Sequence, residues 1–105
     1  MPSPEWDIID ILCEAGDEPL GFALGQYQSW IPSASFERVR HAVWMMISTS
    51  PLVLLRGPDS ATAEPVPEWE VRHILADYEN WVPPDDPPRF WLHMTDEGCR
   101  SHWGE

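Results

Sequence analysis

Prolines restrict where helices and strands can run in this sequence more than any other feature. The chain has 105 residues, and 12 of them are proline. A proline ring removes a backbone donor and disfavours helix in the residue before it, so proline tends to open a helix or to end one. Pro4 and Pro67 can each open a helix, Pro51 ends one, and the proline-rich run 83–88 is predicted to be an exposed connector. The length and these boundaries predict one small domain over residues 1–105, built from short elements.

Residues 4–15 are predicted to form the first helix, with Ser3 as its cap and Gly16 as its stop. Its apolar side chains cover well over half of the circumference at helical spacing. A helix this apolar is expected at the centre of the fold or in a dimer interface. The remaining narrow strip is an acidic face made of Asp7, Asp10 and Glu14.

Residues 35–48 have the pattern of an amphipathic helix capped by Ser35. An apolar stripe is predicted to face inward, and a polar stripe outward. The inward stripe consists of Phe36, Val39, Val43 and Ile47, flanked by Trp44 and Met46, and the outward stripe of Glu37, Arg38, His41 and Met45.

The rest of the chain is predicted to alternate short helices and strands. We expect an extended piece near residues 20–22 with a helix to about Trp30, a strand over 52–55 and a loop over 57–67. A helix opened by Pro67 has an apolar stripe, and Trp81 is expected to pack just beyond its end. A strand over 89–94 and a final helix capped by Thr95 complete the chain. The stripe is Val71, Ile74, Leu75 and Tyr78; Phe90, Leu92 and Met94 are expected on one face of the last strand, and Trp91 and His93 on the other.

Net charge is the strongest global signal in the composition. Eighteen acidic residues against six basic ones give a formal net charge of −12. Such a surface repels nucleic-acid phosphates and anionic membranes at long range. It favours solubility and a basic protein partner, although a solvated surface without a specific partner is an equal alternative.

The sequence contains no pattern that predicts catalysis, a cofactor or a small-molecule substrate. Its four histidines are scattered, and no nucleophile elbow, glycine-rich phosphate loop or zinc-protease motif is present. Cys99 and His102 are spaced closely enough to share a metal, but Cys13 is the only other thiol, so we expect no metal site. We therefore predict that the protein is not an enzyme.

Cysteine content and the lack of an apolar leader or spanning segment predict a cytoplasmic protein with reduced thiols. The expected compartment argues against a disulfide between Cys13 and Cys99.

Two stretches of the sequence resemble parts of a winged helix. Residues 35–47 followed by Ser-Pro-Leu-Val-Leu-Leu-Arg at 50–56 resemble a third helix running into a first wing strand. Residues 89–100, with Thr95, Glu97, Gly98 and Arg100, resemble a second wing strand and the turn into a closing helix found in MarR-like and PadR-like bacterial regulators. The resemblance implies an α+β fold, mostly α, with a small antiparallel wing sheet. The wing would carry a helical insertion at about 58–88, which we expect to cover Trp91. The first and last helices often pack together in this fold, which makes a contact between Cys13 and Cys99 plausible.

The resemblance and the charge predict different functions. The resemblance implies a DNA-binding regulator that uses helix 35–48 and contacts DNA through Arg38, Arg40, His41 and Met45. The charge opposes this function, so we predict a non-enzymatic domain that binds protein, as a homodimer or with a basic partner, more readily than DNA. A weaker alternative is a nucleic-acid mimic that uses the acidic face.

Trp69 is a second candidate for an interface, together with Arg72 and His73. On a helical wheel it falls opposite the apolar stripe of its helix, and an exposed tryptophan on a rigid helix often anchors an interface. The alternative is that Trp69 folds back under the proline-rich loops.

Overall fold

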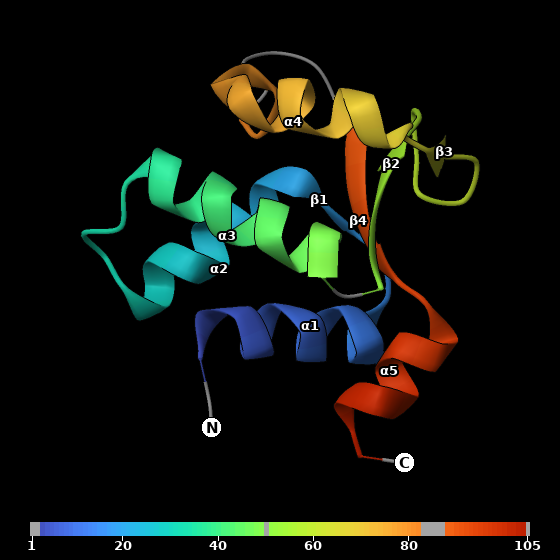
Figure 1. Ribbon diagram of the computed structural model, residues 1–105. Helices are drawn as coiled ribbons and strands as arrows, with labels where there is room; N and C mark the ends of the chain where they lie inside the picture. The colour runs from blue at the N-terminus through green and yellow to red at the C-terminus, as the bar shows by residue number, and fades with distance from the viewer. Residues whose placement is uncertain (1–2, 50, 83–87, 105) are drawn as a thin grey trace.

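The computed structural model describes residues 3–49, 51–82 and 88–104, which form α-helices around a small antiparallel sheet (Figure 1). The predicted α+β class, mostly helical, is therefore confirmed. Apart from Pro88, the predicted connector 83–88 lies outside the described residues. The elements are α1 (Pro4–Ala15), β1 (Glu18–Pro19), α2 (Leu20–Trp30), α3 (Phe36–Thr49), β2 (Leu52–Arg56), β3 (Glu64–Pro65), α4 (Glu68–Ala76), the 3-10 helix η1 (Tyr78–Asn80), β4 (Phe90–Met94) and α5 (Asp96–His102).

The predicted helix caps are confirmed at three helices. Ser3 Oγ accepts a hydrogen bond from the backbone N–H of Trp6 at 3.0 Å, and Thr95 Oγ1 accepts one from Gly98 at 3.0 Å. Ser35 Oγ likewise accepts the backbone N–H of Arg38 at 3.2 Å. Gly16 ends α1 with a φ of 95°, a conformation that L side chains rarely adopt.

The strands form one sheet in the order β1-β4-β2-β3, with every neighbouring pair antiparallel. β2 and β4 pair along their whole length, from Leu52 opposite Met94 to Arg56 opposite Phe90. β4 alternates as predicted. Phe90, Leu92 and Met94 are buried, while Trp91 and His93 are only partly covered.

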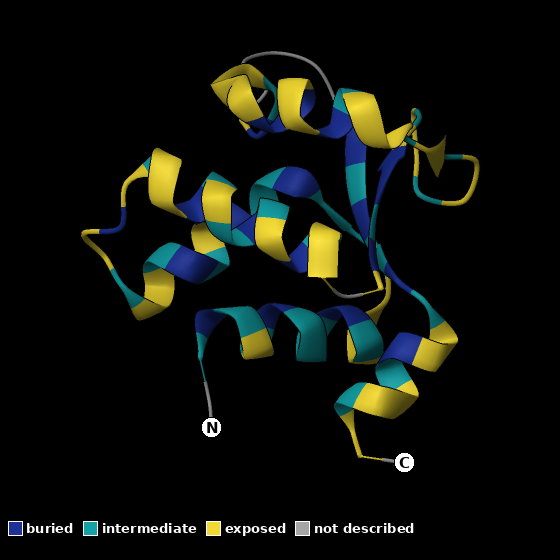
Figure 2. Ribbon diagram, viewed as in Figure 1, coloured by how far each residue is buried: buried dark blue, intermediate teal, exposed yellow. Residues whose placement is uncertain are grey.

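The core lies where α1, α2, α3 and α4 meet one side of the sheet, and their buried residues form one continuous cluster (Figure 2). In α3 the predicted stripe is confirmed at Val39 and Val43, and Glu37, Arg38, His41 and Met45 are exposed as predicted. Met46 is buried more deeply than Phe36 and Ile47, which are partly exposed. The side chains without measurable exposure are Ile8, Leu20, Ala23, Val39, Val43 and Leu92.

Two predicted boundaries are wrong. The extended piece is Glu18–Pro19, and the helix already begins at Leu20. Position 21 of that helix requires a glycine because the backbone of Trp81 approaches it closely. A Cβ there would collide with the Trp81 carbonyl oxygen. The predicted loop 57–67 contains β3, whose Pro65 pairs with Leu55 at a sheet edge, where a proline is tolerated.

The insertion between β2 and β4 does not cover Trp91 as predicted. Val71, Ile74 and Leu75 of α4 join the main core cluster, whereas Trp91 lies outside it and donates its indole N–H to the Gly57 carbonyl at 3.1 Å. The apolar stripe of α4 packs against α3 and the core side of the sheet, so the insertion enlarges the core. Tyr78 departs from the predicted stripe and is half exposed.

Trp81 packs just beyond α4, as predicted. Its side chain is 2% exposed, and its indole N–H donates to the Leu75 carbonyl at 3.0 Å. The rings of Trp81 and Phe36 meet edge to face with centroids 5.5 Å apart. These contacts fix the end of the insertion against α3.

Cys13 and Cys99 form a disulfide that joins α1 to α5. The expectation that the first and last helices pack together is confirmed, and the expectation of reduced thiols is wrong. The two Cα atoms are 5.5 Å apart, the usual separation for bonded cysteines.

Among the described residues, every helix is too short or too polar to cross a bilayer.

Candidate binding surfaces

Three tryptophans gather around the outer side of α1. Trp6 belongs to α1 itself, Trp30 is the last residue of α2, and Trp103 follows α5. Their exposed fractions are 42%, 43% and 48%, high values for such large apolar side chains. We call this surface the aromatic–acidic face and define it as Trp6, Asp7, Asp10, Glu14, Trp30 and Trp103.

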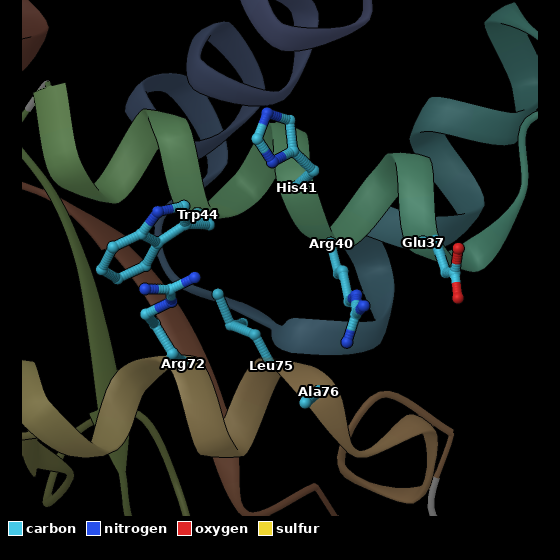
Figure 3. A pocket seen from close by; sticks show the side chains of 7 residues that line it. All are labelled: Glu37, Arg40, His41, Trp44, Arg72, Leu75 and Ala76. Atoms are coloured by element: carbon cyan, nitrogen blue, oxygen red, sulfur yellow. The ribbon is translucent and has the colours of Figure 1, made fainter.

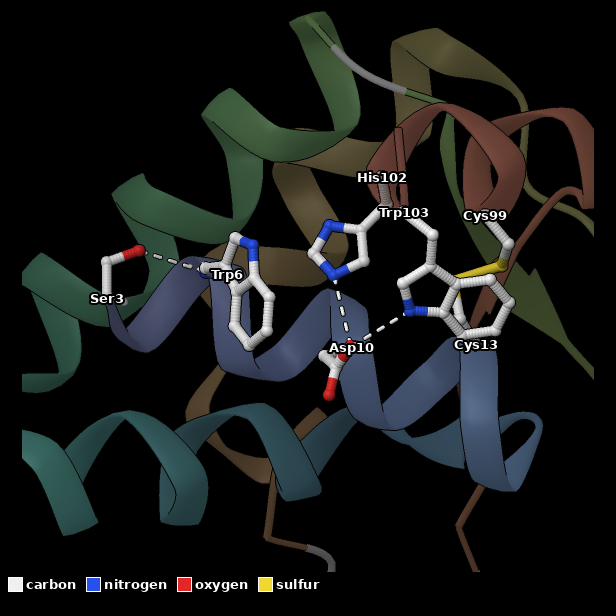
Figure 4. A network of polar contacts seen from close by, with 7 residues as sticks. All are labelled: Ser3, Trp6, Asp10, Cys13, Cys99, His102 and Trp103. Carbon is white, nitrogen blue, oxygen red and sulfur yellow. Dashed lines mark hydrogen bonds and ion pairs between the residues drawn. A yellow bond between two sulfur atoms is a disulfide. The ribbon is translucent and has the colours of Figure 1, made fainter. Parts of the chain in front are cut away.

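Two carboxylates of α1 hold these rings in place. Asp7 Oδ2 accepts the indole N–H of Trp30 at 3.0 Å and also accepts a hydrogen bond from Gln26. Asp10 Oδ1 accepts the indole N–H of Trp103 at 3.1 Å and lies 3.3 Å from His102 Nε2 (Figure 4). The polar edge of two indoles is therefore satisfied within the protein, and their aromatic surface remains exposed.

These hydrogen bonds engage two of the three residues of the predicted acidic face. Asp7 and Asp10 are partly buried and already bonded, and Glu14 is exposed. The second carboxylate oxygen of Asp10 points away from both rings that its partner oxygen contacts (Figure 4). The acids therefore position aromatic side chains and still present negative charge to solvent.

His102 and the disulfide complete the α5 side of this surface. The His102 ring packs against Trp6 with centroids 4.8 Å apart. Its side chain is only 8% exposed, and the disulfide lies in the same contact between α1 and α5 (Figure 4). The position of Trp103 thus depends on how firmly α5 is held to α1.

A groove of about 450 Å³ lies between α3 and α4. Arg40 and Arg72 extend into it from the two opposite helices (Figure 3). The Arg72 guanidinium lies over the ring of Trp44 at 5.2 Å from the centroid, a cation–π arrangement. We call this the arginine groove; its lining is Glu37, Arg40, His41, Trp44, Arg72, Leu75 and Ala76.

The four predicted DNA contacts do not form one surface. Arg40 lines the arginine groove, whereas Arg38 and Met45 line a different hollow between α3 and α1, and exposed His41 borders both. The Arg38 guanidinium lies 5.9 Å from the centre of the Tyr27 ring. Helix α3 thus presents its cations in two directions.

The predicted interface around Trp69 is also divided. Trp69 is 73% exposed, so the alternative that it folds back under the loops is wrong. Arg72 instead turns toward α3, and His73 is exposed. Trp69 stands out from α4 without the aromatic neighbours that surround α1.

The candidate metal pair, Cys99 and His102, is committed to other contacts. The sulfur of Cys99 is bonded to Cys13, and His102 is paired with Asp10. Within residues 3–49, 51–82 and 88–104, no group of three or more histidine, cysteine or acidic side chains could hold a metal ion. His93 lies 2.6 Å from Asp17 and forms a second imidazole–carboxylate pair.

Sequence reasoning did not identify Trp30 and Trp103 as functional candidates. Trp30 is 23 positions from Asp7, and Trp103 is 93 positions from Asp10. No local periodicity links residues so far apart, so only the packing of α2 and α5 on α1 reveals the surface.

Comparison with known proteins gives no relative from which a function could be transferred. No protein-family model matches the chain, and no curated protein and no solved structure does so. The chemistry of the two surfaces is therefore the basis for a functional assignment.

Proposed function

We propose that this chain is a non-enzymatic, winged-helix-like domain that acts by binding another protein. The fold part of the proposal is supported by the order of the elements: α3 leads into β2, and β4 leads into α5. It is also supported by the antiparallel pairing of β2 and β4, the strands expected to form the wing. The insertion makes this a wing that packs into the core.

The observation that carries the binding part is the clustering of Trp6, Trp30 and Trp103 on one face. Tryptophan is among the residues that contribute most to protein interfaces, because one ring buries a large rigid area at small entropic cost. Hydrogen bonds to Asp7 and Asp10 fix two of these rings before any partner arrives. A preorganised aromatic surface loses little conformational freedom on binding.

The charge of the chain favours a partner of a different sequence over a second copy. Two copies would bring surfaces of net charge −12 together, which costs free energy at low ionic strength. We therefore favour a heterologous complex over the homodimer that the sequence left open.

Photo-crosslinking from position 6 tests this function. A photoreactive phenylalanine analogue replaces Trp6 in the chain produced in its own cells, and illumination is expected to give one discrete adduct with another protein. The same analogue at Glu79, an exposed position on η1, is the matched control and should give none. No adduct at position 6, or equal adducts at both positions, would contradict the proposal.

DNA binding is the second candidate, and the number of arginines near α3 favours it, although they point in two directions. Three of the six arginines lie on α3 or beside it: Arg38 and Arg40 belong to the helix, and Arg72 turns toward it. Random duplex DNA at low salt tests this candidate, because electrostatic attraction is strongest there. Binding that disappears in the Arg38→Ala/Arg40→Ala double variant would establish it, and no binding at low salt would remove it.

Nucleic-acid mimicry is not part of the proposal, because a mimic needs a row of free anions. Asp7 and Asp10 instead accept hydrogen bonds from indole groups. A cytoplasmic location also stays a prediction, and the disulfide weighs against it, since such bonds persist mainly in oxidising compartments. Thiol labelling of protein taken from its own cells decides this point: labelled cysteines would favour the cytoplasm.

A further inference from the structure

We infer that the aromatic–acidic face binds a basic polypeptide segment, with arginine or lysine side chains lying over its tryptophan rings. This inference rests on the proposed function and adds the chemistry of the partner. It is supported by the charge around α1, by the hydrogen bonds that hold Trp30 and Trp103 and by the exposure of all three tryptophans.

The helices around the aromatic–acidic face carry mostly acidic charge. Helix α1 carries Glu5, Asp7, Asp10 and Glu14 and no basic residue, and α2 carries no charged residue at all. In α5, Arg100 stands beside two acids, Asp96 and Glu97. The potential over this side of the molecule is therefore negative, and it attracts a cationic segment.

The orientation of the indoles also favours a cation. The positive edge of an indole includes its N–H, while the π face carries negative charge. At Trp30 and Trp103 the N–H already donates to a carboxylate, so the negative π face is what remains for a partner. A guanidinium or ammonium group over such a face is attracted to it.

A cationic side chain suits this surface better than a nucleic acid or a second copy of the chain. A nucleic acid is repelled by the acids, and a second copy of the chain brings the same acids with it. An arginine can lie over a tryptophan ring and donate to a nearby carboxylate oxygen at the same time, because its planar group has several donors. Exposed Glu14 and the second oxygen of Asp10 provide such acceptors.

NMR of the oxidised, nitrogen-15-labelled chain tests the inference through the indole N–H signals. The probe is a short synthetic peptide of alternating arginine and glycine, and a peptide of alternating glutamate and glycine is its control. The arginine peptide is expected to shift the signals of Trp6, Trp30 and Trp103. Trp69, which is 73% exposed and lies outside this face, should not shift.

Matched substitutions locate the binding site. Trp103→Ala is expected to weaken peptide binding roughly tenfold, the effect of losing one aromatic anchor, whereas Trp69→Ala should leave it unchanged. Should Trp103→Ala lose the disulfide or its dispersed spectrum, Glu14→Gln provides a milder test, because Glu14 is exposed. Glu14→Gln should weaken binding about two- to fivefold, and Glu68→Gln on α4 should have no effect.

Three outcomes would overturn the inference: no shift with the arginine peptide at low salt, shifts confined to Trp44 or Trp69, or equal losses in Glu14→Gln and Glu68→Gln. Concentration-dependent shifts of Trp6 and Trp103 without peptide would also overturn it, because a second copy would then be the occupant. A protein adduct from position 6 would still support the proposed function in the first case. The failure of the inference and the failure of the function can therefore be told apart.

Discussion

The aromatic–acidic face and the arginine groove both combine tryptophan with charge, but they use opposite parts of the indole ring. On the aromatic–acidic face, carboxylates accept hydrogen bonds from the N–H edges of Trp30 and Trp103. In the groove, the guanidinium of Arg72 lies over the π face of Trp44. The first arrangement leaves π faces available to an external cation, whereas the second already has one covered. The comparison shows why similar residues at two places favour different partners.

The two surfaces also differ in what holds them together. The arginine groove lies between α3 and α4, whose buried residues Val43, Val71 and Leu75 belong to the core. The aromatic–acidic face joins segments near both ends of the chain, and the disulfide and polar contacts hold α5 to α1. Removing one kind of contact at a time should therefore affect one surface more than the other.

The largest expected effect comes from replacing both cysteines with serine. The disulfide closes a loop with a sequence separation of 86. The chain-entropy model assigns a loop of this size about 4–5 kcal/mol of stability. Urea unfolding should show a loss of this order, and the indole signals of Trp6 and Trp103 should move while that of Trp44 changes little.

The control is the same measurement on the unsubstituted chain with a dithiol reductant, which should reproduce the loss. The reductant should then have no further effect on the double-serine variant. Equal perturbation of Trp44 and Trp103 would show that the disulfide supports the whole fold, and the contrast between the two surfaces would be lost.

Gly21→Ala should disturb the contact between α2 and the end of the insertion. Alanine in a helix is normally favoured over glycine by about 1 kcal/mol. Here the added Cβ would meet the Trp81 carbonyl oxygen at 2.1 Å, and overpacking of this kind costs about 1–3 kcal/mol. The clash outweighs the propensity, so we expect net destabilisation in thermal unfolding.

Gly25→Ala is the matched control, because a Cβ there meets nothing within 4 Å and Gly25 lies in the same helix. It should be neutral or slightly stabilising. If Gly21→Ala were also stabilising, the close contact between α2 and the end of the insertion would not exist as described.

Arg72→Ala should give the smallest effect. A cation–π contact at an exposed site contributes about 0.5–1 kcal/mol; Arg72 is exposed and Trp44 partly so. The expected change is a small loss in unfolding free energy with a shift of the Trp44 indole N–H NMR signal. Arg100→Ala, which removes an exposed arginine from α5, should leave Trp44 unchanged; the same Trp44 response in both variants would argue against the stacked arrangement.

Local chemistry made much of the fold predictable. Caps at Ser3, Ser35 and Thr95 depend on neighbouring residues, and the alternation in β4 follows from strand geometry. The position of α4 was not predictable, because its stripe would suit either side of the sheet. Glu18–Pro19 and Glu64–Pro65 are too short to leave a periodic signal, and they are strands only because β4 and β2 pair with them.

The candidate surface was harder to predict than the fold. The sequence indicates the acids of α1 but not their role, since Asp7 and Asp10 bond to residues 23 and 93 positions away. The expected compartment argues against a bond between the cysteines, although the packing of α1 on α5 places their Cα atoms 5.5 Å apart. Contacts between the chain ends depend on the whole tertiary structure, which no local pattern records.

The disulfide also determines how the protein responds to mechanical force. A pull on segments outside Cys13 and Cys99 passes through α1, the sulfur–sulfur bond and α5, and the residues between the two cysteines stay out of the load path. Each residue released under tension adds about 3.5 Å of length, and while the disulfide is intact the residues between Cys13 and Cys99 add none. After reduction, the same pull would draw out the sheet and the core. A single bond thus determines whether a pull from outside the two cysteines can unfold the core.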